Sequence, residues 1–294
     1  MVSAVRTVLG RVEPAALGAV DAHDHLFIRS PRLPGQELDD VGRAAEALGA
    51  FRELGGGTVV QWTPYGMGRR AGELPSLSRE SGVHIVAATG LHQAAHYADE
   101  VLRSVLDRLT GLFVGELTEG IGDTGVRAGM IKVAGGFHGL DDHATRTMRA
   151  AAEAHHVTGA PIAVHLELGT GALDVLDLLC GELEVAPRSV ILGHLNRSPD
   201  FTVHRLAAEA GAYLAFDGPS RANHATDWRM PDALAALADA GFADRLLLGG
   251  DTVTPDTPGM PYLMRRVRPR LELALGDELV ERILVSNPGR VYAW

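Results

Sequence analysis

Eight apolar runs of strand length, alternating with helical patterns, constrain the fold of this chain more than any other feature. Strands that are apolar throughout are buried on both faces, which is typical of a parallel sheet. Alternating strands and helices indicate either a doubly wound sheet or a closed barrel, and eight repeats in 294 residues fit the barrel better. We therefore expect a single (β/α)8 TIM barrel domain over residues 1–294. The expected strands are residues 18–28, 58–63, 84–90, 129–135, 161–167, 189–195, 212–218 and 245–251.

Charge and cysteine content narrow the classes of function. The formal net charge of −10 argues against a nucleic-acid partner and against an anionic membrane surface. The single cysteine, Cys180, excludes an internal disulfide and a cysteine-based zinc site. No signal-peptide pattern and no apolar stretch of membrane-spanning length is present. We expect a cytoplasmic protein that acts on a small molecule.

Polar residues interrupt the apolar strands near their carboxyl ends. His23 and His25 are two positions apart, so their side chains point the same way along a strand. A lone histidine in such a strand is more often a core residue, and an aspartate after two glycines is more often a turn or a helix cap. Chemistry in this barrel lies at the carboxyl ends of the strands, and six such groups favour one site. They are His23, His25, Lys132, His165, His194 and Asp251.

Four imidazoles and a carboxylate indicate a metal site. These ligands suit zinc, manganese, cobalt or iron, and they divide better between two divalent ions than around one. Lys132 lies among apolar neighbours, which favour its neutral amine. A neutral amine can add carbon dioxide, and the resulting carbamate would bridge two ions. The alternatives are a one-metal site and a Lys132 that reaches solvent and pairs with a carboxylate.

The motifs together resemble the phosphotriesterase family of the amidohydrolase superfamily over nearly the whole chain. "HDH" matches that family's opening HxH, and "GELTEGIGDTGVRAGMIKVA" resembles the stretch that leads to its carboxylated lysine. "PIAVHLELGTG" and "VILGHL" match the segments of its third and fourth histidines. "LLLGGD" and "ILVSNPGRVYAW" match its terminal aspartate and its C-terminal asparagine-proline signature.

The resemblance implies a role for each of the six residues. His23, His25 and Asp251 would hold the more buried ion, and His165 and His194 the more exposed one. Zinc is the first expectation, with manganese or cobalt as alternatives, and carboxylated Lys132 and a hydroxide would bridge the pair. The hydroxide would attack the substrate while Asp251 accepts a proton. Dimers are common in the family, so the resemblance also allows a homodimer.

The loops that set the substrate depart from the family pattern. Arg197 and Pro199 stand where phosphotriesterases carry relay aspartates, and His92 stands where related lactonases place a tyrosine. Arginines favour carboxylate or phosphate recognition, so we expect a small anionic ester, lactone or amide as substrate. The alternatives are hydrolysis of organophosphate triesters and a barrel that binds metal or ligand without turnover. The candidate substrate-binding residues are His92, Arg197, Arg221, Trp228 and Arg69.

Overall fold

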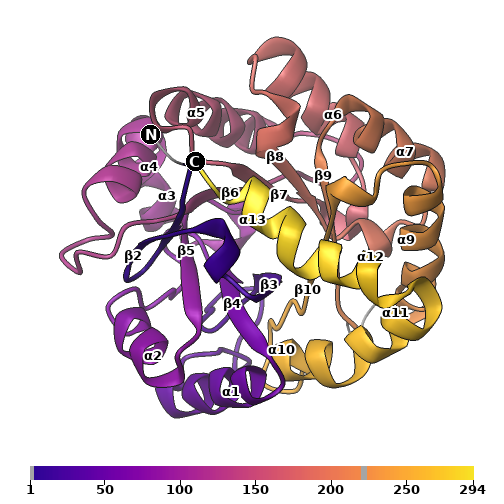
Figure 1. The fold of residues 1–294 in the computed structure, drawn as a ribbon. Coiled ribbons are helices and arrows are strands. Elements are labelled where there is room, and N and C mark those ends of the chain that lie inside the picture. Colours follow the sequence, from indigo (N-terminus) through magenta and orange to yellow (C-terminus); the bar gives the residue numbers. More distant parts are fainter. Residues whose placement is uncertain (1–2, 220–223) are drawn as a thin grey trace.

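The computed structural model describes residues 3–219 and 224–294, with a barrel of eight parallel strands at its centre (Figure 1). Each strand pairs in parallel with the next, in the order β3 to β10. The predicted barrel is thus confirmed, and every predicted strand overlaps an observed one. The strands are β3 (Ala19–Asp24), β4 (Gly56–Gln61), β5 (His84–Gly90), β6 (Met130–Ala134), β7 (Ile162–His165), β8 (Val190–Gly193), β9 (Tyr213–Asp217) and β10 (Leu246–Gly249).

Close approach of β10 to β3 brings the first and last strands together. The backbone N–H of Asp251 donates to the carbonyl of His23 over 2.9 Å. A Cβ placed on Gly249 would lie 2.7 Å from that same carbonyl oxygen, so only glycine fits there. The "GGD" sequence therefore places Asp251 directly beside His23 in β3.

Helices surround the barrel on the outside (Figure 1). Asp40 and Asp141 begin two of them by accepting a hydrogen bond from a backbone N–H in the first turn. Among the described residues, no helix has both the length and the apolar character that crossing a membrane requires. The helices are α1 (Val41–Glu53), α2 (Leu74–Ser81), α3 (Asp99–Val105), α4 (Leu109–Thr118), α5 (Asp142–Thr158), α6 (Ala172–Leu176), α7 (Phe201–Ala210), α8 (His224–Asp227), α9 (Met230–Asp239), α10 (Gly259–Tyr262), α11 (Arg268–Leu275), α12 (Asp277–Glu281) and α13 (Asn287–Val291).

The core forms two layers, one inside the barrel and one between strands and helices. Side chains alternate across a strand, and β6 shows the consequence. Met130 packs in the inner layer, whereas Ile131 and Val133 pack in the outer one. Lys132, two residues after Met130, therefore points into the barrel, above its apolar filling.

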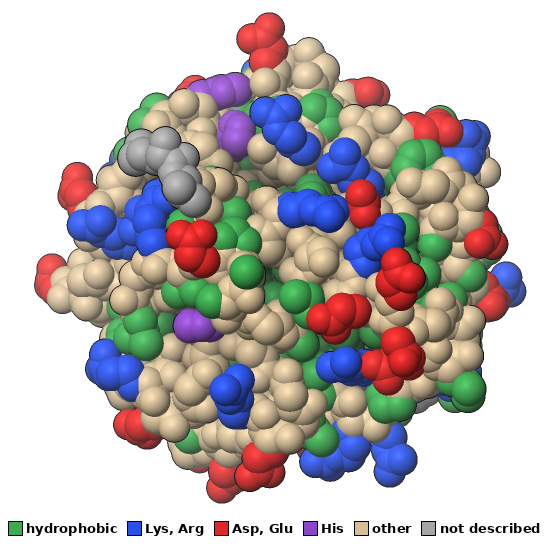
Figure 2. Space-filling view, in the orientation of Figure 1, with side chains coloured by type: hydrophobic (Ala, Val, Ile, Leu, Met, Phe, Trp, Pro, Cys, Tyr) green, Lys and Arg blue, Asp and Glu red, His purple; other side chains and the backbone are tan. Residues whose placement is uncertain are grey.

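The amino-terminal end of the barrel is covered by both termini. A hairpin of β1 (Val5–Thr7) and β2 (Gly10–Val12) lies there, and Val5 bridges to Ala293 near the other end of the chain. Figure 2 shows this face, over which side chains of both charge signs are interspersed. The covered end leaves the carboxyl ends of the strands as the place for a site.

Candidate metal centre

A cavity of about 390 Å³ lies at the carboxyl ends of the strands. All six residues that the sequence singled out line it, so the prediction that they converge is confirmed. Their role as metal ligands stays a prediction. They come from β3, β6 and β7 and from the residues that follow β3, β8 and β10: His23, Lys132, His165, His25, His194 and Asp251.

Asp217, at the end of β9, orients two of the histidines. His23 Nδ1 lies 3.2 Å from one carboxylate oxygen, and His194 Nδ1 lies 2.8 Å from that oxygen and 3.0 Å from the other. Burial opposes the charge of Asp217, but the neighbouring His194 and Arg197 outweigh it and hold the pKa of this carboxyl well below its usual range. A carboxylate only accepts, so both imidazoles carry their proton on Nδ1. Their Nε2 lone pairs are left for the cavity.

His25 is fixed in the same way by a threonine. Its Nδ1 lies 2.7 Å from the hydroxyl of Thr63, and that hydroxyl donates its own proton to the carbonyl of Phe27. The imidazole must therefore donate through Nδ1. Its Nε2 lone pair lies 3.8 Å from Asp251 Oδ1, and that of His23 lies 3.5 Å from the same oxygen.

His165 faces the cavity with Nδ1, whereas the other three histidines face it with Nε2. Its Nε2 lies 3.1 Å from the carboxylate of Glu167, which also accepts a hydrogen bond from Gln93. The Nδ1 lone pair of His165 then lies 2.8 Å from His194 Nε2. Two lone pairs at this distance repel one another, whereas a cation that both coordinate would attract them. The donor set therefore fits metal ions.

Burial and the absence of a partner set Lys132 apart. Its side chain is buried, and within residues 3–219 and 224–294 it forms no hydrogen bond or ion pair. Burial lowers its pKa to about 7, although the nearby Asp251 acts in the opposite direction. The alternative in which Lys132 reaches solvent and pairs with a carboxylate is wrong. A lysine that is about half neutral at pH 7 fits the chemistry of carbamate formation.

Asp251 joins the two sides of the cavity. One oxygen faces His23 and His25, and the other binds the guanidinium of Arg197. Burial raises the pKa of Asp251 to about 6, although Arg197 opposes the shift. The backbones of His194 and Asp251 both have positive φ, 64° and 50°, a conformation that is costly without glycine. Two of the six candidate ligands therefore have a strained backbone conformation.

The candidate substrate-binding residues divide into two groups. His92 and Arg197 line the cavity, as expected. Arg69 does not, because its guanidinium forms a buried ion pair with Glu116 and donates to the carbonyl of Ala88. Placing Arg69 at the substrate was therefore wrong.

Trp228 needs the same correction. It lines a different cavity and has no place in the wall of this one. Arg221 falls outside the described residues.

Sequence reasoning missed the residues that hold the ligands in place. Asp217, Thr63 and Glu167 each bind the outer nitrogen of a ligand histidine. Asn196 in turn fixes Asp217, because its amide donates to the carbonyl of Asp217 and accepts from the N–H of that residue. The aspartate that ends strand 212–218 was the one available signal, since it occupies a position equivalent to those of the ligands.

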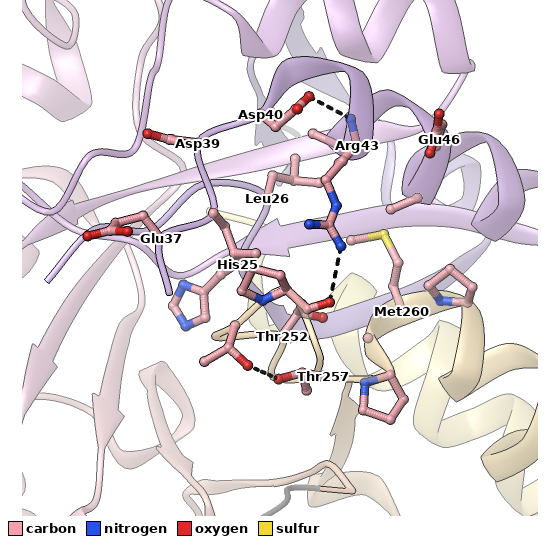
Figure 3. Close-up of a pocket in the computed structure, with 18 residues that line it drawn as sticks. His25, Leu26, Glu37, Asp39, Asp40, Arg43, Glu46, Thr252, Thr257 and Met260 are labelled. Carbon is pink, nitrogen blue, oxygen red and sulfur yellow. Dashed lines mark hydrogen bonds between the residues drawn. The ribbon is translucent and has the colours of Figure 1, made fainter. Parts of the chain in front are cut away.

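A second cavity of about 540 Å³ adjoins the first, between α1 and the segment after β10 (Figure 3). His25, Thr254 and Thr257 line both cavities. In the wall of the second, Arg43 donates to the carbonyl of Pro255 and ties α1 to that segment. Four carboxylates also line it: Glu37, Asp39, Asp40 and Glu46.

Comparison with known proteins gives a consistent result. The model of the phosphotriesterase family matches residues 3–292. A phospho-furanose lactonase of Mycoplasmopsis agalactiae is 30% identical, over 99% of this chain and 91% of that protein. An N-acetyltaurine hydrolase of Salmo salar is 26% identical, over 97% of each chain.

Solved structures agree with this result. The crystal structure of a lactonase from Listeria monocytogenes superimposes with a TM-score of 0.91 at 28% identity, over 99% of each chain. The phosphotriesterase homology protein of Escherichia coli, complexed with phosphate in its active site, gives a TM-score of 0.88 at 26% identity. That match covers 94% of this chain and 99% of the other.

Proposed function

This chain is a hydrolase of the phosphotriesterase family, and on that premise we propose that it uses two divalent metal ions to hydrolyse a small anionic lactone or carboxylic ester. One observation carries the proposal: four histidine lone pairs, fixed by hydrogen bonds behind them, converge with Asp251 and an unpaired buried lysine on one cavity.

The geometry supports two positions for ions. His23, His25 and Asp251 offer three ligand atoms within 4.8 Å of one another. His165 and His194 offer two nitrogens 2.8 Å apart. Lys132, once carboxylated, would supply an anionic ligand between the two groups. Such a donor set suits zinc first, and manganese or cobalt as alternatives.

Divalent ions bound there would polarise the scissile carbonyl and make water acidic enough to yield hydroxide near neutral pH. The residues of the chain do the rest. Asp251 is the one carboxylate among the described residues of the cavity wall, so it is the group placed to accept the proton from the attacking water. Asp217, Thr63 and Glu167 hold the imidazoles in the ligating tautomer.

The charge of the wall supports an anionic substrate. Apart from Asp251, the ionisable side chains in it are cationic or neutral bases, among them Arg197, His92 and His96. Arg197 binds Asp251 and lies 3.4 Å from Asp217, and its fork of donors suits a substrate carboxylate or phosphate that takes over part of these contacts. A named relative acts on a phospho-furanose lactone, which is an anionic substrate of this kind.

A hydrolysis panel with zinc-, manganese- and cobalt-loaded protein tests the proposal. It compares kcat/KM for phosphorylated sugar lactones, neutral lactones of the same ring size, anionic aryl esters and neutral aryl phosphotriesters. We expect the anionic lactones and esters to lead, with about two ions per chain by elemental analysis. Asp251→Asn, purified in parallel, shows that the activity belongs to this chain.

Two outcomes contradict the proposal. If neutral phosphotriesters or long-chain acyl lactones exceed every anionic ester and lactone, the substrate class is wrong. If the active protein holds about one ion per chain, the two-metal site is wrong.

A further inference from the structure

A third cavity, of about 310 Å³, lies away from the metal centre and shares no lining residue with it. Its walls come from α8 and α9 on one side and from α10, the π-helical turn Leu263–Val267 and α11 on the other. Its floor is apolar and buried, formed by Met230, Val267 and Leu271. A concave apolar floor of this size is typical of sites for small molecules.

A large aromatic side chain stands open at this cavity. Trp228 is 64% exposed, although the indole would gain several kcal/mol if it were covered. The guanidinium of Arg270 lies over its ring, 4.5 Å from the centroid. The pair forms a flat, positively charged wall above an apolar floor, where a second flat ring could lie against the indole.

Two cations at the rim form no ion pair with any described residue. Arg266 and Arg270 line the cavity, and neither has an ion pair among the described residues. This is notable in a chain with 37 acidic and 27 basic residues, in which other surface arginines pair with carboxylates, as Arg146 does with Asp107. Asp227, the one carboxylate among the described residues of the wall, accepts a hydrogen bond from Asn196 and keeps its charge, so two cations and one anion leave the described wall with one excess positive charge.

We propose that this cavity is a second binding site, for a small molecule that has a flat aromatic body and one anionic group. The ring lies between Trp228 and the apolar floor, and the anion lies between Arg266 and Arg270. The excess positive charge of the wall favours an anionic ring over a neutral ring of the same size. The site is independent of the hydrolytic reaction and of the substrate proposed above.

Calorimetric titration with a matched pair of probes tests the site. The probes are 2-naphthoate and 2-naphthalenemethanol, which share a ring system and differ in charge. We expect 2-naphthoate to bind once per chain, and at least about tenfold more tightly than the alcohol, as for a charge-assisted pair of contacts. Absence of saturation below about 5 mM would mean only millimolar or weaker affinity and would overturn the proposal.

Surface variants locate the binding. The double variant Arg266→Gln/Arg270→Gln should weaken 2-naphthoate by about tenfold or more and change the alcohol by less than about threefold. Trp228→Ala should weaken both probes. Arg265→Gln is the matched control, because Arg265 is exposed on the same π-helical turn and does not line the cavity. All four side chains are exposed, so the variants should fold, and thermal unfolding checks this.

Other occupants give distinct results. If His92→Ala abolishes 2-naphthoate binding while the double arginine variant keeps it, the probe occupies the metal cavity and the proposal is wrong. Leu273, near Arg270 on α11, is 91% exposed and tests for a second copy of the chain. If sedimentation shows a dimer that Leu273→Glu dissociates, this face is an interface and the ligand site is wrong.

Discussion

Replacing Asp217 by asparagine changes one oxygen of a carboxylate into an NH2 group, behind two of the candidate ligands. In the native protein one oxygen accepts from His23 Nδ1 at 3.2 Å and from the backbone N–H of His194 at 3.1 Å, and His194 Nδ1 lies 2.8 Å from that oxygen and 3.0 Å from the other. An amide offers one accepting oxygen to these donors. In either orientation of the amide its NH2 group lies within about 3 Å of His194 Nδ1, and the charge that holds the Nδ1 protons is lost, so the tautomer with a free Nε2 lone pair is favoured less.

The size of the effect follows from the bonds lost. A hydrogen bond to a charged group contributes about 1.5–3 kcal/mol, and about 1.4 kcal/mol corresponds to tenfold in affinity. We therefore expect Asp217→Asn to bind zinc about 10- to 100-fold more weakly, in the range typical of groups that orient metal ligands. The side-chain volume is unchanged, so the apolar core should be affected little.

Competition against a chromophoric chelator measures this affinity without reference to catalysis. Asp239→Asn is the matched control, because Asp239 is exposed at the end of α9. Thermal unfolding of the metal-free proteins separates a folding defect from a binding defect. If Asp217→Asn binds zinc with native affinity and stoichiometry, then Asp217 does not set the tautomers of these histidines and the reasoning is wrong.

Three further predictions concern other side chains. Lys132→Ala should lower bound metal and activity, because a bridging ligand is lost, and added propionate should restore part of both; full activity without it would contradict the carbamate. Arg69→Met should destabilise the protein by about 3–5 kcal/mol in urea unfolding, because Glu116 keeps its buried charge without a partner; a loss below about 1 kcal/mol would show that the pair is not needed. Burial raises the pKa of Cys180 to about 11, so little of the thiol is thiolate at pH 8. Its alkylation rate by iodoacetamide should rise about tenfold per pH unit up to about pH 11, and a plateau near pH 9 would contradict the raised pKa.

Local sequence patterns predicted most of the barrel, because each strand has a recognisable pattern of its own. An apolar run bounded by glycine or proline, with a polar residue near its end, marks both a strand and a candidate ligand. The hairpin of β1 and β2 was not among the predicted strands. These segments are short or weakly patterned, and their positions depend on packing against the barrel rather than on their own periodicity.

The sequence predicted those features of the candidate site that depend only on which way a side chain points from its strand. His23 and His25 share a face because they are two residues apart, and Lys132 points inward because Met130 does. The partners of these residues were beyond reach, since Asp217 contacts His23 across 194 positions of the chain. Arg69 and Trp228 were misplaced for a related reason: the partner of Arg69, Glu116, lies 47 residues away, and Trp228 faces a different group of helices.

The sequence by itself determined the barrel, the family and the six inward-facing polar residues, because alternation along a strand is a property of the backbone alone. The tertiary structure decided which nitrogen of each histidine faces the cavity, because a tautomer follows from a hydrogen-bond partner on another strand. It also decided the environment of Lys132. The sequence shows one lysine among apolar neighbours, but only the closed barrel buries that amine without an ion pair among the described residues, and this burial lowers its pKa.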